Sequence, residues 1–418
     1  MKKNNLWDRV YGTVARMTFA VLATCSFFAC SKDDDIPSVV SPYVENRTVM
    51  VYMVAENSLN NAASKDVAEM LIGMNNDTLS VADRLVIYLD DIQFPRIYVV
   101  DKNTKKTSLT DLQPVVTYEE DVNSASVAQL EAFVDYVKSH YPADSYGLVM
   151  WSHSSGWTPS TYSGDMTDEA SVIRKSFGLD NGKDSTNKYL EGNQMNIEDL
   201  ASALKGENFD FIFFDACIMQ NIEVAYELRH VTKCLVASPA EIPAEGANYK
   251  TMTRAMFLKE NCTNEMLKAY LRQYQSSVGL VISSVNTSAL DDYATYMKSI
   301  VLAHRSEMLS LDTNSMLNYI RYPSWTTVYP DYLDMQGIML NVLGTEEYAQ
   351  WKEETAKVVT CMHAGRWYSD YPRNMVEIDD AQCCGVTMFI PFEKYARSSW
   401  AFNEKYLKTS WAKAVWIE

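Results

Sequence analysis

Short apolar runs alternate with amphipathic segments along the first 250 residues. Residues 47–55 (RTVMVYMVA) form a nearly continuous apolar run rich in β-branched side chains, which predicts a strand buried on both faces. Residues 59–74 and 126–140 instead repeat their apolar positions at helical spacing. The same two patterns predict further strands at 84–89, 96–100, 146–151, 209–214 and 233–237, and a further helix at 219–229. This alternation predicts an α/β fold, with a mainly parallel sheet covered by helices on both faces.

The pattern becomes less regular after about residue 250. Helical spacing is present at 264–275, 291–308 and 346–363, and apolar runs at 279–285 and 385–391 predict two strands. We therefore expect two parts: a core domain at residues 46–250, and an irregular, mostly helical C-terminal lobe at residues 251–418 that packs on the core and can return strands to its sheet.

The chain opens with a basic segment followed by an uncharged apolar run at residues 17–30. This run suits an export signal, and it is shorter than the about 20 residues that a membrane-spanning helix needs. Phe27-Phe28-Ala29-Cys30 resembles a bacterial lipobox, and the Ser-Lys-Asp-Asp-Asp that follows resembles the tag of surface lipoproteins in Bacteroidetes. The prediction is a signal peptide at 1–30, a tether at 31–45, and an outer-membrane lipoprotein, exposed at the cell surface, whose lipid anchor is at Cys30. A plain secreted protein is the alternative.

Charge and cysteine usage narrow the classes of partner and cofactor. The chain carries 37 Lys and Arg against 54 Asp and Glu, a net charge of −17, which argues against a nucleic-acid partner. Its eight cysteines include no C-x-x-C pair, so neither a disulfide framework nor a zinc site is expected. The segment at residues 180–184 (DNGKD) resembles a calcium loop only superficially, because it lacks the ligand spacing and the terminal glutamate. We predict no cofactor and no metal, with calcium left open as an alternative that no motif in the sequence supports.

A histidine and a cysteine follow two of the predicted core strands. His153 comes just after the strand at 146–151, and Cys217 just after the strand at 209–214. Because parallel strands end at one edge of a sheet, we expect the imidazole and the thiol to meet there, where the imidazole can take the thiol proton and the thiolate can attack a carbonyl. The helix predicted after Cys217 would favour the thiolate. Taken singly, either residue is more often structural.

Both motifs resemble segments of the clostripain family of cysteine peptidases, within the caspase-like superfamily. The resemblance is carried by residues 148–157 (LVMWSHSSGW), 209–228 (FDFIFFDACIMQNIEVAYEL) and 237–246 (ASPAEIPAEG), and extends to 49–60. It implies a caspase-like fold and a Cys–His dyad, with Cys217 as the nucleophile and His153 as the general base and then the acid. It also implies an oxyanion hole made by the backbone N–H groups of Ser154 and Cys217.

Ser154 departs from the family pattern, which usually has glycine after the histidine. A backbone conformation with positive φ would be strained for serine. This departure favours the alternative function, a catalytically weak or inactive surface lipoprotein that uses the peptidase fold as a protein- or peptide-binding module.

The resemblance further implies cleavage of peptide or protein substrates after Arg or Lys. Asp215 matches the position of an acidic residue that the family places beneath the substrate side chain, and Glu241 and Glu245 are weaker candidates for the same pocket. The alternative role for Asp215 is a cap on the following helix. Family members are often matured by a cut between the two motifs, and Arg174-Lys175 is the predicted autoprocessing site.

Overall fold

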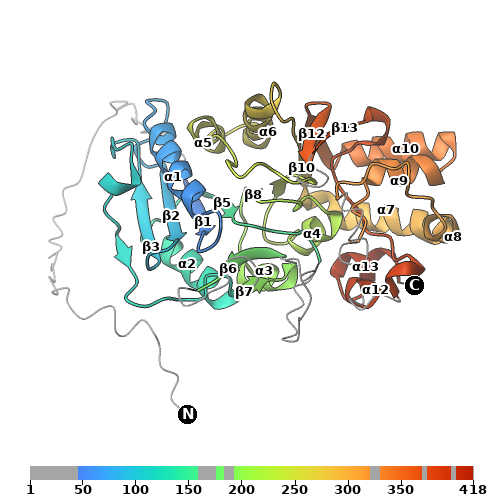
Figure 1. Cartoon of the computed structure of the whole chain (residues 1–418), viewed down its shortest axis with the longest axis horizontal. Helices are drawn as coiled ribbons and strands as arrows, with labels where there is room; N and C mark the ends of the chain where they lie inside the picture. Colours follow the sequence, from blue (N-terminus) through green and yellow to red (C-terminus); the bar gives the residue numbers. More distant parts are fainter. Residues whose placement is uncertain are drawn as a thin grey trace, which may run out of the picture. The chain divides into compact units, whose positions relative to one another are not determined.

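A nine-stranded sheet in the order β11-β10-β9-β8-β5-β1-β2-β3-β4 organises the structure (Figure 1). The computed structural model describes residues 46–158, 176–182, 193–320, 330–369, 374–396 and 402–417. The five central strands, from β9 to β2, are parallel to one another, and the flanking strands pair antiparallel. The strands of this sheet are Arg47–Val54 (β1), Arg84–Asp90 (β2), Arg96–Val100 (β3), Val116–Thr117 (β4), Ser145–Trp151 (β5), Phe211–Asp215 (β8), Cys234–Ala237 (β9), Val281–Asn286 (β10) and Val359–His363 (β11).

Two small antiparallel sheets and a set of helices complete the described elements. The small sheets pair Phe177–Asp180 (β6) with Asn193–Met195 (β7), and Arg366–Ser369 (β12) with Asn374–Glu377 (β13). The helices are Asn60–Met74 (α1), Val127–His140 (α2), Ile197–Ala203 (α3), Ile222–Glu227 (α4), Tyr249–Met256 (α5), Cys262–Tyr274 (α6), Leu290–Ala303 (α7), Arg305–Leu309 (α8), Met335–Val342 (α9), Thr345–Ala356 (α10), Glu393–Ala396 (α11), Phe402–Tyr406 (α12) and Ser410–Val415 (α13).

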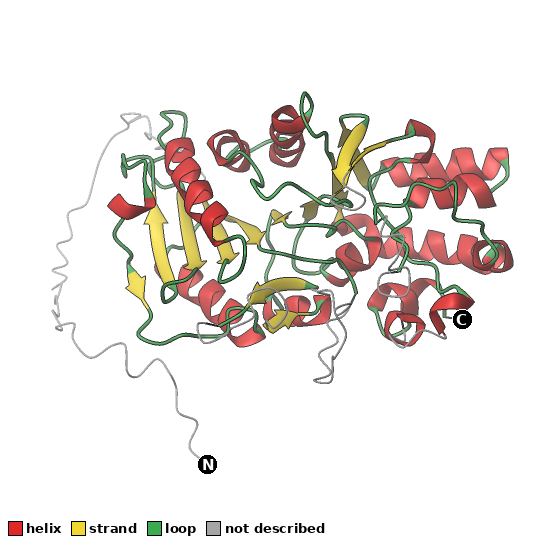
Figure 2. Ribbon diagram, viewed as in Figure 1, coloured by secondary structure: helices red, strands yellow, loops and turns green. Residues whose placement is uncertain are grey.

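Both faces of the sheet are apolar, which explains why its central strands read as continuous hydrophobic runs. Along β1, alternate residues belong to two separate cores: Tyr52 packs in the core that contains residues of α2, α3 and α4, whereas Val51 and Met53 pack in the core that contains residues of α1, α5 and α6. Helices accordingly lie on both sides of the strands (Figure 2). This arrangement confirms the predicted fold class.

Three sequence-based expectations about individual elements were wrong. The segment 346–363 is not one helix: α10 ends at Ala356, and residues 359–363 form β11, because this β-branched segment pairs with β10 along the edge of the sheet. Residues 385–391 form no named strand, only isolated bridges at Thr387 to Asn221 and Asp334. The helix predicted from residue 219 begins only at Ile222.

The sheet continues across the predicted domain boundary at residue 250. Residues Val44–Glu418 form one compact unit, in which β10 and β11, from the C-terminal half, extend the sheet of the N-terminal half. The predicted return of strands from the C-terminal half is therefore observed, while the boundary itself stays a prediction.

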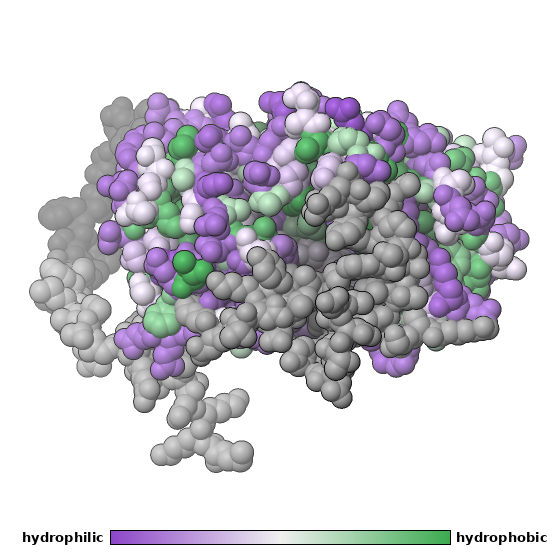
Figure 3. All heavy atoms as spheres, viewed as in Figure 1, coloured by the Kyte–Doolittle hydropathy of each residue, from purple (hydrophilic) through white to green (hydrophobic). Residues whose placement is uncertain are grey.

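The described surface is mainly hydrophilic. On the face drawn in Figure 3, hydrophobic residues are scattered among hydrophilic ones. Large exposed apolar side chains, such as Val81, Leu258 and Leu407, belong to segments far apart in the sequence. In the part of the chain that the structure describes, no helix combines the length and the apolar character needed to cross a membrane.

A fully buried carboxyl group joins α4 to the C-terminal segment. Glu223 Oε1 accepts a hydrogen bond of 2.9 Å from the N–H of Phe389, while Oε2 is buried without a hydrogen-bond partner. Burial raises the pKa of Glu223 from its ordinary 4.5 to about 8. The folded protein therefore keeps this proton at neutral pH, whereas the unfolded chain releases it.

Replacing Glu223 with glutamine is expected to change the pH dependence of stability. Near pH 4 the carboxyl is protonated in both states, so Glu223→Gln should match the wild type. Between pH 4.5 and 8 the wild type loses up to about 1.4 kcal/mol of unfolding free energy per pH unit at this group. The variant should avoid this loss and have the higher Tm at pH 9. Thermal denaturation at the two pH values measures the effect, with exposed Glu346→Gln as the control; equal Tm differences at both pH values would contradict it.

Candidate functional site

The register between β5 and β8 places the predicted histidine and cysteine at equivalent positions. Trp151 of β5 pairs with Asp215 of β8 in a parallel ladder. His153 and Cys217 each follow by two residues, so both lie just beyond the carboxyl ends of neighbouring strands. Both residues are partly exposed. The structure thus brings the two residues to the same edge of the sheet, as the sequence predicted.

Cys217 lies in an irregular loop between β8 and α4 (residues 216–221, the cysteine loop) rather than at a helix N-terminus. Because α4 begins five residues later, at Ile222, the expected helix-dipole effect on the thiol was wrong. Instead, Cys217 Sγ faces the backbone of Ile242: the Ile242 N–H donates to the sulfur at 3.5 Å, and the thiol donates to the Ile242 carbonyl at 3.9 Å. Ile218 has φ +60°, a rare conformation for a β-branched residue, and its N–H donates to the carbonyl of Ala240 at 3.0 Å. The segment after β9 therefore holds the cysteine loop in a strained conformation.

Ser154 does not have the positive φ that raised doubt about this position. The described non-glycine residues with positive φ are Lys105, Ile218 and Asn261. Ser154 instead faces Phe177 of β6 in an antiparallel bridge whose hydrogen bonds are made by the flanking residues, so the Ser154 N–H is not used in this pairing. Its hydroxyl donates to the carbonyl oxygen of Cys217. Serine is thus accommodated without backbone strain. Its side chain links the loop after β5 (residues 152–158, the histidine loop) to the cysteine loop.

A second link between the two loops runs through Asn221. Its Oδ1 accepts a hydrogen bond of 2.9 Å from the N–H of Trp157, and its Nδ2 donates to Thr387 Oγ1 at 2.8 Å. Gly156, with φ +71°, makes room for this contact, because a Cβ there would lie 2.1 Å from Asn221 Oδ1. The histidine loop, the cysteine loop and the segment around Thr387 therefore form one connected unit.

Asp215 lies beneath this edge, buried and hydrogen-bonded. Its carboxylate accepts from the hydroxyls of Tyr249 and Tyr270, each at 2.8 Å, and from the N–H of Ala247 at 3.0 Å. It therefore does not cap α4, the alternative role considered from the sequence. Burial raises the pKa of Asp215, and these hydrogen bonds oppose that rise. Gly246 lies directly above, since a Cβ there would be 2.6 Å from Asp215 Oδ2.

The two glutamates of the segment after β9 occupy different environments. Glu241 is half-buried and accepts a hydrogen bond of 3.0 Å from Ser369 Oγ, whereas Glu245 is exposed. Glu241 lies between Ala240 and Ile242, which both contact the cysteine loop. This segment therefore lies beside Cys217.

Sequence reasoning missed a further buried carboxyl at Asp66 of α1. Asp66 Oδ2 accepts a hydrogen bond of 2.8 Å from Trp151 Nε1, so it lies under the end of β5. Burial, with a contribution from the charge of Asp215, raises the pKa of Asp66 to about 9. A signal was present: Asp66 interrupts the apolar face of α1 formed by residues such as Ala63 and Met70.

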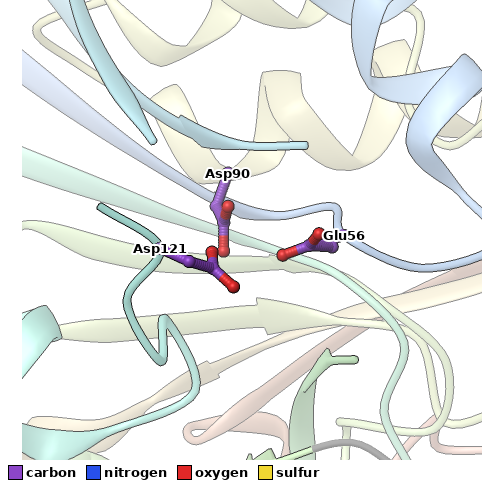
Figure 4. Close-up of side chains that lie close together, drawn as sticks. All are labelled: Glu56, Asp90 and Asp121. Atoms are coloured by element: carbon purple, nitrogen blue, oxygen red, sulfur yellow. The ribbon is translucent and has the colours of Figure 1, made fainter. Parts of the chain in front are cut away.

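A group of carboxylates separate from these residues has the spacing of a cation site. Glu56, Asp90 and Asp121 each offer an oxygen, and these oxygens lie within 4.8 Å of one another (Figure 4). Glu56 and Asp90 are buried, and Asp121 is exposed. Oxygen donors of this kind suit a hard cation such as Ca²⁺. Residues 180–182 reach the same place, since the N–H of Asn181 donates to the carbonyl of Glu56 at 3.2 Å. The sequence-based prediction, no metal with calcium left open, stays a prediction.

Three predicted site residues, Cys30, Arg174 and Lys175, lie outside the described residues. The predicted lipid anchor and the predicted autoprocessing site therefore stay predictions.

Comparisons with known proteins agree with the resemblance seen in the sequence. A family model described as the clostripain family, Peptidase_C11, matches residues 51–416. Over 223 residues the chain is 26% identical to "Clostripain" of Hathewaya histolytica, a match that covers 48% of this chain and 40% of that protein. The chain thus spans less than half the length of this curated relative.

Two solved structures are similar over most of the chain. A secreted C11 cysteine protease from Bacteroides thetaiotaomicron, in complex with an irreversible peptide inhibitor, has a TM-score of 0.72 at 28% identity, and the match covers 88% of this chain and 98% of that one. An inactive zymogen C11 protease from Parabacteroides distasonis has a TM-score of 0.71 at 28% identity, with 88% and 97% covered.

Proposed function

Because the chain belongs to the clostripain family, we propose that it is a cysteine endopeptidase in which Cys217 and His153 form the catalytic dyad. The observation that supports this proposal is the shared register: each residue follows the paired positions Trp151 and Asp215 by two residues, at the carboxyl ends of adjacent parallel strands. Hydrolysis of Arg- and Lys-aminomethylcoumarin peptides by the wild type, but not by Cys217→Ala, tests it.

The proposed reaction follows from the chemistry of the two side chains. His153 takes the thiol proton of Cys217, and the sulfur attacks the peptide carbonyl to form a tetrahedral adduct. The N–H groups of Ser154 and Cys217 are proposed to bind its oxyanion. The C–N bond then breaks, the amine leaves with the proton from His153, and water hydrolyses the thioester with His153 again acting as the base.

We further propose that the substrate carries Arg or Lys at the cleaved position. The support is the concentration of carboxyl groups around this edge: Asp215 below, and Glu241 and Glu245 on the segment that also contacts Cys217. Of these, Asp215 is the strongest candidate, because its buried position and fixed hydrogen bonds give a carboxylate of defined geometry. A cationic side chain nearby would favour its ionised form.

The proposed location is the outer surface of the cell, through a lipid on Cys30. The support is the lipobox-like sequence and the acidic tag that follows it. Cells that express the wild type and are fed labelled palmitate are expected to label the protein, and Cys30→Ser should remove the label almost completely. Cys25→Ser, in the same apolar run, is the matched control and should keep it. Equal labelling of the wild type and Cys30→Ser would end the proposal.

A further inference from the structure

We propose that Ser58 is a positioning residue that orients and supports His153, an inference that rests on the dyad proposed above. Ser58 Oγ lies 2.7 Å from His153 Nε2, within hydrogen-bonding distance. Ser58 is four residues past the end of β1, far from the histidine in the sequence. Its hydroxyl reaches the ring because β1 and β5 are neighbours in the sheet.

The order of the strands places Ser58 and Cys217 on different sides of His153 along the edge of the sheet. β5 lies between β1 and β8, and all three strands are parallel. Ser58 follows β1, His153 follows β5 and Cys217 follows β8. The three residues therefore come from successive strands at one edge, with the histidine in the middle. Ser58 occupies Nε2, so we assign Nδ1 as the nitrogen that serves Cys217.

The loop that carries Ser58 is fixed by its neighbour Asn57. The Asn57 amide donates to the carbonyls of Val54 at 2.9 Å and Leu179 at 2.8 Å, and its Oδ1 accepts from the N–H of Leu59 at 2.9 Å. Asn57 is buried, so these bonds are shielded from water. The backbone on both sides of Ser58 is thus held in place, and the hydroxyl is presented to the ring at little cost in conformational entropy.

The histidine loop is fixed in the same way on its other side. The carbonyl of His153 accepts a hydrogen bond of 3.0 Å from the N–H of Gly178, and Ser152 Oγ donates to the carbonyl of Val54 at 2.7 Å. The Ser58–His153 contact therefore joins two segments whose backbones are already anchored, so it acts on the orientation of the imidazole rather than on the fold.

The chemical role proposed for this contact is to support the tautomer that can act as a base, since a serine hydroxyl can accept a hydrogen bond from Nε2–H. A neutral imidazole carries one proton, and only the nitrogen without it accepts another. When Nε2–H donates to Ser58 Oγ, the lone pair lies on Nδ1 and can receive the proton of Cys217. The imidazolium formed then keeps its Nε2–H hydrogen bond to the same oxygen. Ser58 thus supports both the base and its conjugate acid, without touching the substrate.

The test is a comparison of Ser58→Ala with Ser58→Thr. Ser58→Ala is expected to lower kcat/KM by about 10- to 100-fold, mostly through kcat, because orientation of the base contributes to the chemical step. Loss of the acceptor destabilises the imidazolium, and since His153 must be unprotonated to take the thiol proton, the acid limb of the pH profile should move to lower pH. Ser58→Thr keeps the hydroxyl and should restore most of the rate and the wild-type profile. Asn60→Ala, in the same segment, should stay within about twofold of the wild type.

Two outcomes would overturn the proposal. One is a Ser58→Ala enzyme with unchanged kcat/KM and an unchanged pH profile. The other is a rate loss that comes with a lower Tm, leaves the pH profile in place and is not restored by threonine, which would make the role structural. Failure of the dyad itself is distinguishable, because His153→Ala or Cys217→Ala would then retain activity whatever Ser58 does.

Discussion

Replacing Cys217 with alanine is expected to lower kcat/KM on Arg- and Lys-aminomethylcoumarin peptides by roughly four orders of magnitude or more. Without the thiolate no acyl-enzyme forms, and what remains is the weak effect of substrate binding and the oxyanion donors. The fold should be unaffected, since Cys217 is partly exposed at the edge of the sheet. Equal Tm values of variant and wild type would separate lost chemistry from lost structure.

Cys234→Ala is the matched control for this experiment. Cys234 is also a free cysteine, but burial raises the pKa of its thiol to about 12, so it stays protonated and unreactive at neutral pH. Its replacement should leave the rate unchanged, and iodoacetamide should inactivate the wild type and Cys234→Ala equally. Substantial activity in Cys217→Ala would refute the assigned nucleophile. Absence of activity in every form, wild type included, across basic and neutral substrates would favour the binding-module alternative.

Cys217→Ala also tests whether the chain processes itself. If the chain cuts itself at Arg174-Lys175, purified wild type should convert to two fragments, while Cys217→Ala should remain one band. Conversion of Cys217→Ala at the wild-type rate would show that another protease makes the cut.

Asp215→Asn is expected to reduce kcat/KM for substrates with Arg or Lys at the cleaved position by about 100-fold. Removing one partner of a shielded charge pair costs about 2–5 kcal/mol, and asparagine removes the charge while keeping nearly the same shape. Substrates with a neutral residue at that position gain nothing from the carboxylate and should change little. The measured quantity is the ratio of kcat/KM for matched basic and neutral peptides.

Two controls distinguish charge from packing at Asp215. Tyr270→Phe removes one of its hydrogen bonds but leaves the carboxylate, so the preference for basic residues should survive. Glu245→Gln changes an exposed group and should alter the ratio by no more than a few-fold. If the Asp215→Asn enzyme is folded and keeps the full preference for Arg and Lys, another carboxylate must determine this specificity.

The central strands, most of the covering helices and the edge that carries the candidate site could be predicted from the sequence alone. Continuous apolar runs such as residues 47–54 located the central strands, because these strands are buried on both faces, and period-3.6 patterns located the helices that cover them. The rule that parallel strands end at one edge was enough to predict that His153 and Cys217 lie at the same edge of the sheet. Segments without strong periodicity were less certain: residues 359–363 became a strand only because β10 offers an edge with which to pair.

Tertiary structure alone decided how the site is supported. No local pattern predicts that Ser58 reaches His153, that Ile242 points its N–H at Cys217, or that tyrosines from α5 and α6 hold Asp215. The helix expected to activate Cys217 begins too late, and Ser154 is relaxed because β6 lies alongside it. The physical reason is common to all of these. Periodicity reports which side chains leave water, whereas hydrogen bonds between loops depend on which strands become neighbours, and that order is fixed only when the whole sheet assembles.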